Sequence, residues 1–383
     1  MIIDSHAYSF QQPGIAEGYE NEYEHLAWIQ QVQARHHQPS IKLSDRTLGS
    51  ADYLAPLENS LSELPDADFR IDHKMGRVLW EWNGETYTKY YYPPNLRNLE
   101  FTPSSLVSEM DHAGIDLALL HTNPSLGKSN QYQYDCIRQF PDRLLSMASV
   151  NEWLIVSNPD QVIESTVHAI EKLNLSAIKF NPTVYISDNK PWDDGKYRSF
   201  WEVATKLGVP IFFTLGTGPD FTSQSNRNQN ASEGFLNELR ILIRWMERYP
   251  DVSCSITHGF PWRVFRKGNK IKLPESVWDP FKNPNLHMEV CFPVRTGDVF
   301  DFPYTEIWPN LSEMIDNIGP ERLHYGTDMP FQNRFCTYTQ SRRWIEHHYQ
   351  KATGINKSSI SMLMGGTIAS LLDIKSHKNK GSL

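Results

Sequence analysis

Long apolar runs and paired cysteines are both scarce in this 383-residue chain. Its apolar runs extend to about eight residues, whereas a helix that crosses a bilayer needs roughly 20. The widely spaced cysteines, without a C-x-x-C pair, are Cys136, Cys254, Cys291 and Cys336. We therefore expect reduced thiols in a cytoplasmic protein, and no membrane partner.

A positive net charge is also lacking. The net charge is −8 at pH 7, and the sequence pI is about 6.0. Because nucleic-acid phosphates bind basic surfaces, this balance predicts no nucleic-acid partner. The opening residues do not show the basic segment and apolar stretch of a secretory signal. Signatures of nucleotide-binding loops (G-x-G-x-x-G, the P-loop) and of serine hydrolases (G-x-S-x-G) are absent as well.

Strand-like and helix-like segments alternate from about residue 104 onward. Stretches such as Gln161–Lys172 carry apolar residues at helical spacing, and short apolar runs typical of buried strands lie between them. The expected strands are Met1–Tyr8, Asp116–His121, Leu144–Val150, Ala177–Asn181, Pro210–Leu215, Ser253–His258, Leu286–Pro293 and His324–Asp328. This alternation predicts a parallel sheet, and about eight strands close a (β/α)8 TIM barrel. The alternative is an open doubly wound sheet, which normally carries the glycine-rich turn that this chain lacks.

A long insertion separates the first expected strand from the others. We expect one barrel domain over residues 1–374, with the insertion at 9–101 and a polar tail at 375–383. Asn83-Gly84 lies between two strand-like arms of the insertion and predicts a hairpin. Since the insertion leaves from the carboxyl end of strand one, we expect it to cover the barrel mouth or to form a subunit interface.

Metal-competent side chains occur at four of the expected strand ends. They are Asp4 and His6, His258, His287 and Glu289, and Asp328. Catalytic groups of a parallel barrel come from the carboxyl ends of its strands. Imidazole and carboxylate groups are the usual ligands of Zn, Fe and Mn. The pattern therefore predicts a divalent metal site at the barrel mouth, with buried histidines of structural role as the alternative.

Several short motifs resemble one enzyme family. In chain order they are Ile2-Ile3-Asp4-Ser5-His6-Ala7-Tyr8, Met110-Asp111-His112-Ala113-Gly114-Ile115-Asp116, Phe140-Pro141-Asp142-Arg143, Lys179-Phe180-Asn181-Pro182, Thr257-His258-Gly259 and Tyr325-Gly326-Thr327-Asp328-Met329-Pro330. Together they resemble the amidohydrolase superfamily, in the branch of aminocarboxymuconate-semialdehyde decarboxylase and γ-resorcylate decarboxylase. The resemblance implies a TIM barrel with His-x-His on strand one, histidines on strands five and six, and an aspartate on strand eight.

The resemblance also implies roles for individual residues. His6 matches a metal ligand, and His258 matches a histidine that binds metal or handles protons. Asp328 matches an aspartate that binds metal and acts as a base on metal-bound water. Two positions depart from the pattern, because Tyr8 and Thr214 stand where the family has histidines. Half of the usual ligands are therefore missing, which argues against a conventional mononuclear zinc site.

Glu289 is the residue expected to compensate. Residues 286–293 and 334–338 are similar to a sub-branch of non-haem metal hydroxylases that act on small carboxylic acids. The ligand set expected on this basis is His6, His258, Glu289 and Asp328. Exchanging Glu289 for glutamine would then lower metal occupancy as severely as exchanging Asp328 for asparagine. The alternative is a buried ion pair between Glu289 and Arg295 or Arg334.

Three residues are expected to bind a substrate carboxylate: Lys179, Arg295 and Arg334. For Lys179 the alternatives are a carboxylated bridging lysine and a salt bridge inside the barrel. Arg266 is a further basic residue expected at the mouth. Tyr8 is expected to be catalytic, as a phenolate ligand or proton donor, with a packed aromatic as the alternative.

Three functions remain open at this point. The first is a metal-dependent hydrolase or decarboxylase of a small carboxylate, in which His258 and Asp328 move protons. The second is a non-haem iron or manganese hydroxylase on the same barrel. The third is a degenerate subunit that stabilises an active homologue. The expected partners are accordingly a small carboxylate substrate and a second subunit, in a homo-oligomer or beside a homologue.

Overall fold

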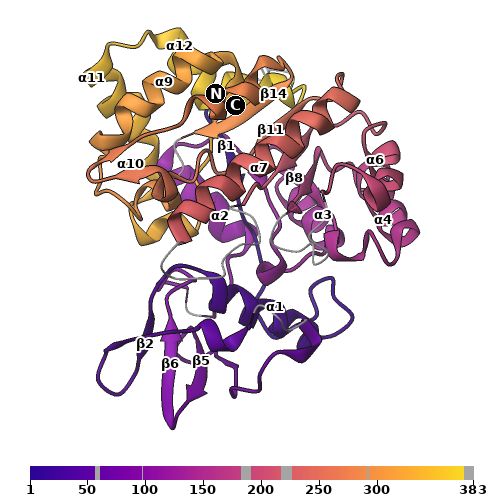
Figure 1. Cartoon of the computed structure of the whole chain (residues 1–383), viewed down its shortest axis with the longest axis vertical. Helices are drawn as coiled ribbons and strands as arrows, with labels where there is room; N and C mark the ends of the chain where they lie inside the picture. Colours follow the sequence, from indigo (N-terminus) through magenta and orange to yellow (C-terminus); the bar gives the residue numbers. More distant parts are fainter. Residues whose placement is uncertain (57–60, 97, 183–190, 217–226, 291–292, 375–383) are drawn as a thin grey trace, which may run out of the picture.

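The computed structural model describes residues 1–56, 61–96, 98–182, 191–216, 227–290 and 293–374 (Figure 1). The expected tail at 375–383 and Cys291 lie outside these residues. Within the described part of the chain, none of the helices is long and apolar enough to span a membrane.

Eight parallel strands form the centre of the molecule. They are β1 (Ile3–Ala7), β7 (Leu117–Leu120), β8 (Leu144–Ser149), β9 (Ala177–Phe180), β10 (Ile211–Phe213), β11 (Cys254–Ile256), β14 (Leu286–Val290) and β15 (Leu323–Tyr325), in this order across the sheet. The chain segments after β1 and β15 meet, because the Asp328 N–H donates to the His6 carbonyl and the Tyr8 N–H to the Met329 carbonyl, both at 2.8 Å. The sheet thus closes on itself. The predicted TIM barrel is confirmed, and the open doubly wound sheet is wrong.

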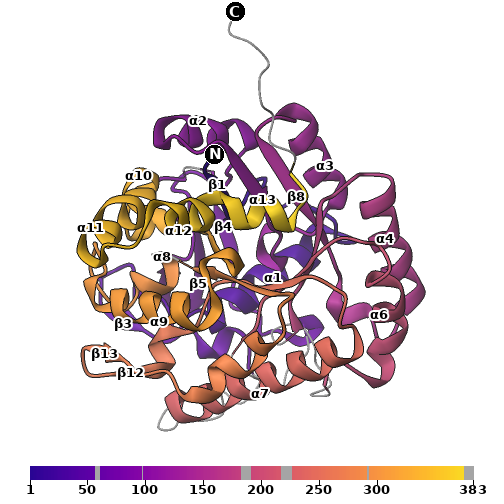
Figure 2. The same cartoon turned by 90° about the horizontal axis from the view of Figure 1, so that it is seen from above.

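Helices surround the barrel and cover the outer face of its strands (Figure 2). They are α2 (Pro103–Ala113), α3 (Asn130–Gln139), α4 (Pro159–Glu171), α6 (Arg198–Ala204), α7 (Arg227–Arg248), α9 (Trp308–Ile318) and α10 (Tyr338–Arg343). Proline occupies the first turn of α4, where no N–H is needed, and Val162, Thr166 and Ile170 form its buried face. The helical pattern at Gln161–Lys172 therefore predicted a real helix.

The amino-terminal end of the barrel is sealed by apolar side chains. Ile368 of α13 (Thr367–Leu371) lies in one buried cluster with Ile3, Leu119, Met147 and Phe212. Burying such side chains stabilises this end of the barrel by roughly 2 kcal/mol each. The polar residues considered for the site lie at the opposite end, at the carboxyl ends of the strands.

The insertion folds around α1 (Glu22–Arg35) and a five-stranded antiparallel sheet (Figure 1). The sheet consists of β3 (Leu48–Gly49), β2 (Ser40–Lys42), β6 (Glu85–Lys89), β5 (Arg77–Trp82) and β4 (Arg70–Asp72), in this order. Asn83 and Gly84 both have positive φ, 52° and 75°, which is the turn that the Asn-Gly pair predicted. Trp80 is fully buried in a core of its own with Leu54 and Ala67.

The insertion contacts the carboxyl end of the barrel at several points, of which two lie near Arg334 and Asp298. The Tyr91 carbonyl accepts a hydrogen bond from Arg334 Nη1 at 3.0 Å, and the Tyr91 ring lies 5.1 Å from the Phe331 ring. Gln38 Nε2 donates to Asp298 Oδ1 at 3.3 Å. These contacts suit the expected roof over the mouth, which stays a proposal, as does the alternative of a subunit interface.

A capping box fixes the chain after β15. Thr337 Oγ1 accepts the Gln340 N–H at 3.2 Å, and Gln340 Oε1 accepts the Thr337 N–H at 2.8 Å. Tyr338, the first residue of α10, donates its hydroxyl to Asp4 Oδ2 at 2.6 Å. The cap therefore positions a side chain that supports β1.

Replacing Thr337 by alanine should lower the free energy of unfolding by about 1 kcal/mol, because the Gln340 N–H loses its acceptor. Urea unfolding of the variant and of the parent measures this difference. Thr337→Ser, which keeps the hydroxyl, should lose less. Equal stabilities of Thr337→Ala and the parent would contradict the prediction.

Candidate active site

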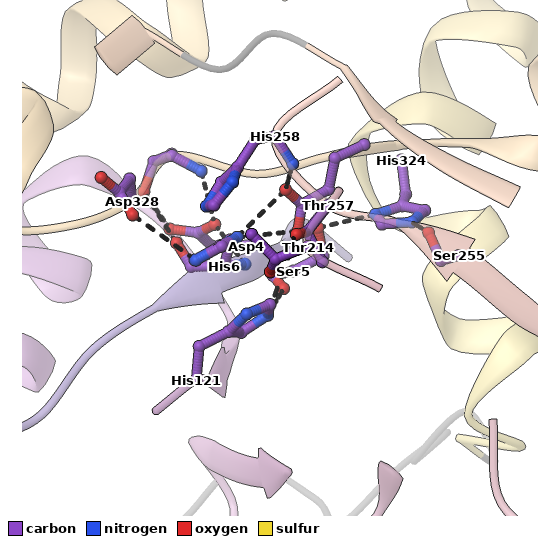
Figure 3. Close-up of polar contacts among 12 residues, drawn as sticks. Asp4, Ser5, His6, His121, Thr214, Ser255, Thr257, His258, His324 and Asp328 are labelled. Carbon is purple, nitrogen blue, oxygen red and sulfur yellow. Dashed lines mark hydrogen bonds and ion pairs between the residues drawn. The ribbon is translucent and has the colours of Figure 1, made fainter. Parts of the chain in front are cut away.

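His6, His258 and Asp328 lie together at the carboxyl ends of β1, β11 and β15 (Figure 3). His6 Nε2 lies 3.5 Å from Asp328 Oδ1, and the ring centroids of His6 and His258 lie 4.8 Å apart. One possible ligand atom from each of the three residues lies within 4.8 Å of the others. The structure thus brings together the three side chains that the resemblance assigned to one site.

The backbone turns sharply at two of these residues. His258 has a φ of 69° and Asp328 a φ of 66°, in the left-handed region that non-glycine residues seldom adopt. Such conformations cost on the order of 1–3 kcal/mol and persist where the surroundings hold them. Here the Asp328 N–H is held by the His6 carbonyl, and the His258 N–H donates to Glu289 Oε2 at 2.6 Å. Hydrogen bonds within the site therefore hold the strained backbone of His258 and Asp328 in place.

Glu289, on β14, lies on the other side of His6. Both of its carboxylate oxygens are 3.0 Å from His6 Nδ1. When Glu289 is ionised it only accepts, so Nδ1 carries the hydrogen and the lone pair of the neutral imidazole is on Nε2. Nε2 faces Asp328 and the Tyr8 hydroxyl, the latter at 2.9 Å. Glu289 thus sets the tautomer in which the nitrogen that faces Asp328 can bind a metal.

The four expected ligands divide into two groups. Glu289 forms a possible metal-binding group with His6 and His121, whereas Asp328 forms one with His6 and His258. The expectation that Glu289 is a metal ligand stays a prediction. In the described part of the chain, Glu289 contacts His6, His121 and the His258 N–H and forms no ion pair with an arginine.

His121 is the buried residue that sequence reasoning missed. It follows β7, and its ring stacks on His6 with centroids 3.5 Å apart. Its Nε2 lies 2.8 Å from the Ser5 carbonyl and therefore donates, so its Nδ1 accepts from Lys179 Nζ at 2.9 Å. Both nitrogens of His121 are therefore engaged in hydrogen bonds to neighbouring residues. The sequence did hold one signal that could have identified His121, namely its place at the end of the predicted strand Asp116–His121.

Two of the expected arginines, Arg295 and Arg334, lie near the mouth, whereas Arg266 does not. Arg295 Nη2 is 3.4 Å from His258 Nδ1, and among the described residues its buried Nη1 has no hydrogen-bond partner. Arg334 donates to the carbonyls of Tyr91 and Phe331. Arg266 is exposed in a separate hairpin, with its guanidinium 5.3 Å from the Phe300 ring centroid. Arg295 is thus the arginine with a free donor beside His258.

Burial controls the protonation of the site. It lowers the pKa of His6 and of His258 well below the usual value, assisted by Lys179 at His6 and by Arg295 at His258, so both imidazoles are neutral. Burial raises the pKa of Asp328 well above its usual value, although Arg334 opposes this. Burial likewise raises the pKa of Glu289 to about 8, opposed by Lys179 and the His258 N–H. Burial thus destabilises the ionised form of both carboxyl groups. A cation bound beside them would stabilise that form.

Two other predicted positions lie apart from His6. Thr214 follows β10, and its hydroxyl oxygen is 2.8 Å from that of Thr257. His287, at the opposite end of β14 from the mouth, contacts the carbonyls of Cys254 and Asn285 at 3.3 Å. Thr214 therefore supplies a hydroxyl where the family has a histidine. His287 contacts backbone carbonyls of the barrel and not the residues at its mouth.

Comparison with known proteins identifies the family. The sequence model described as amidohydrolase matches residues 57–348. The chain belongs to the amidohydrolase family. The resemblance seen in its motifs is thereby confirmed, together with the barrel that the family implies.

Similar proteins bear on the chemistry of this amidohydrolase. It is 24% identical over 226 residues to γ-resorcylate decarboxylase of a Rhizobium species, a match that covers 52% of this chain and 63% of that protein. It resembles the crystal structure of 2,6-dihydroxybenzoate decarboxylase from Rhizobium, with a TM-score of 0.53, 18% identity and coverage of 72% and 90% of the two chains. A dihydroxybenzoic acid decarboxylase from Polaromonas, solved with manganese and 2-nitroresorcinol, gives a TM-score of 0.53 at 17% identity and coverage of 73% and 89%. The match thus spans less than two thirds of the curated relative, and the solved structures show the same fold.

Proposed function

We propose that this amidohydrolase is a metal-dependent decarboxylase of a small aromatic carboxylate. The observation that carries the proposal is the cluster of His6, His258 and Asp328, beside which Arg295 Nη1 has no hydrogen-bond partner among the described residues. The similarity to γ-resorcylate decarboxylase supports decarboxylation over hydrolysis, the other reaction open from the sequence.

The donor set fits a divalent cation. Two imidazoles and one carboxylate are a common set for Zn, Fe or Mn. His6 offers Nε2 because Glu289 holds its Nδ1–H, and this arrangement of carboxylate and histidine is typical of metal sites. Bound by His6, His258 and Asp328, the cation would polarise substrate oxygen atoms and neutralise developing negative charge.

The substrate carboxylate is assigned to Arg295. A guanidinium binds a carboxylate through two parallel N–H donors, and the buried Nη1 of Arg295 has no partner among the described residues. Burial lowers the pKa of Arg295 to about 10, although Asp328 opposes this, so its guanidinium remains charged near neutral pH. Tyr8 and Tyr91, both packed on Phe331, supply aromatic surface for a ring.

The proposed reaction needs few groups from the chain. The bond between the ring carbon and the carboxyl carbon breaks, and carbon dioxide leaves. The electron pair stays on the ring carbon, which takes up one proton. Arg295 would orient the substrate, Asp328 would help to hold the metal, and the Tyr8 hydroxyl, 2.9 Å from His6 Nε2, would be available as a hydrogen-bond donor within the site.

The test is turnover of 2,6-dihydroxybenzoate and related hydroxybenzoates by protein loaded with Mn²⁺ or Zn²⁺, read as carbon dioxide release. We expect metal-dependent release, and a KM for Arg295→Lys that is raised about tenfold or more, because lysine lacks the paired donors. Arg266→Lys, at the exposed hairpin, is the matched control and should behave as the parent. Absence of release with every metal and substrate would refute the proposal.

A hydroxylase is the second candidate. Two histidines and one carboxylate on one face are also the ligand set of non-haem iron oxygenases. Tyr8 and Thr214, where the family has histidines, favour this candidate over a conventional zinc site. Oxygen consumption by Fe²⁺-loaded protein without carbon dioxide release would favour it, and failure to bind any metal would favour a degenerate subunit.

A further inference from the structure

A buried lysine, Lys179, lies behind the proposed site. It is on β9, is 1% exposed, and among the described residues forms no ion pair with a carboxylate. Its Nζ lies 2.9 Å from His121 Nδ1 and 3.3 Å from Thr257 Oγ1. A lysine buried without a paired carboxylate is costly to keep, which indicates a role for its titratable amine.

A chain of hydrogen bonds connects this amine to the barrel mouth. Thr257 Oγ1 lies 2.8 Å from Thr214 Oγ1, and either hydroxyl can be the donor. Thr257 is fully buried, whereas Thr214 is partly exposed, at the position where the family has its strand-five histidine. Figure 3 shows the side chains of Thr257 and Thr214 next to one another. The order from the interior outward is thus Lys179, Thr257, Thr214.

The hydrogen bond to His121 allows the Lys179 amine to be either protonated or neutral. Because His121 Nε2 must donate to the Ser5 carbonyl, its Nδ1 accepts one hydrogen from Nζ in either protonation state of the lysine. An ammonium then donates to Thr257, and a neutral amine accepts from it with its lone pair. The amine can therefore release a proton and recover it without losing its place.

We propose that Lys179 supplies the proton consumed in decarboxylation, through the hydroxyls of Thr257 and Thr214. The inference rests on the proposed function. The ring carbon takes the proton of Thr214, Thr257 reprotonates Thr214, and the Lys179 ammonium reprotonates Thr257. The neutral amine left behind regains a proton from solvent along the same chain after the product leaves. Lys179 acts through the two threonines and does not touch the substrate.

The surroundings of the amine suit this cycle. Burial lowers the pKa of Lys179 to about 7, opposed chiefly by Glu289 and Asp328, so both protonation states occur near neutral pH. The charged and titratable groups coupled to Nζ are His6, His121, His258, Glu289, Asp328, Lys128 and Glu152. Any pH effect assigned to Lys179 must therefore be tested by removing Lys179 itself.

The first test needs no substrate. Nitrogen-15 NMR of lysine Nζ, assigned by the signal lost in Lys179→Met, reports how fast the Nζ protons exchange with water. Thr214→Val should slow the exchange, and Thr214→Ser should restore it. Thr166→Val, which removes a buried hydroxyl bonded to the Val162 carbonyl in α4, is the matched control and should change nothing. Equal exchange in Thr214→Val and the parent would overturn the relay, whether or not the protein proves to be a decarboxylase.

The second test asks whether turnover uses the relay. Lys179→Met should lower kcat about tenfold, less than loss of a direct proton donor, with KM nearly unchanged. The limb of the kcat profile that falls as pH rises through about 7 should disappear, because the ammonium is the supplying form. An unchanged kcat and profile in an active parent would refute the relay, whereas an inactive parent refutes the proposed function and leaves the exchange result to decide.

Discussion

Asp328→Asn is expected to abolish tight metal binding and to lower the rate of the proposed decarboxylation by about 1000-fold. The asparagine amide keeps an oxygen at the same place but carries no charge. Arg334 and Lys179 both lie within the electrostatic reach of Asp328, so the variant leaves their positive charge less compensated. A cation placed at His6 and His258 would then meet net repulsion. Metal content by mass spectrometry and the rate of carbon dioxide release measure the two effects.

A matched aspartate separates the site from general effects of charge. Asp111 is an exposed aspartate of α2 that pairs with Arg143 at 2.6 Å, and exposed pairs contribute little to stability. Asp111→Asn should therefore keep the metal content and rate of the parent. Full metal content in Asp328→Asn would remove Asp328 from the ligand set. Loss of metal in both variants would indicate a general effect on the fold.

The barrel could be predicted from sequence because its signals are local. Each strand is a short apolar run and each following helix has its own spacing of apolar residues, as in α4. The Asn83-Gly84 turn was equally local, since those two residues adopt positive φ with little strain. What the sequence did not give is the way the insertion meets the barrel. The Tyr91 contact to Arg334 joins residues 243 positions apart, and no pattern near either residue encodes it.

The candidate site was predicted in part, for a related reason. Strand ends and motifs placed His6, His258 and Asp328 at one mouth, and the structure brings them together. Alternation along a strand says which face a side chain is on, but not which atom of a neighbour it touches. Glu289 was therefore predicted beside Asp328, whereas it contacts the opposite nitrogen of His6. His121 lacked a motif of its own, so its stacking on His6 could only come from the closed barrel.

Glu289→Gln is expected to weaken metal binding about 10- to 100-fold through the tautomer of His6. The His258 N–H is a fixed donor 2.6 Å from Glu289 Oε2, so the single amide oxygen of glutamine must face it. The amide NH2 then faces His6 Nδ1 and donates to it. In the neutral ring the hydrogen moves to Nε2, the atom that faces Asp328. A metal must displace that hydrogen before it can bind.

Two measurements on this variant distinguish the possible roles of Glu289. Above its pKa of about 8, where Glu289 is a carboxylate, nitrogen-15 NMR of the His6 ring should show the hydrogen on Nδ1 in the parent and on Nε2 in Glu289→Gln. Chelator competition should show the weaker metal affinity in the same variant. A loss of affinity as severe as in Asp328→Asn would instead make Glu289 a direct ligand.

Glu152→Gln is the matched control, because Glu152 is a buried carboxylate paired with Lys128 at 3.2 Å. It should lower the melting temperature and leave the metal affinity unchanged. If Glu289→Gln behaved in the same way, with full affinity and a lower melting temperature, Glu289 would be a structural carboxylate and its effect on His6 would be refuted.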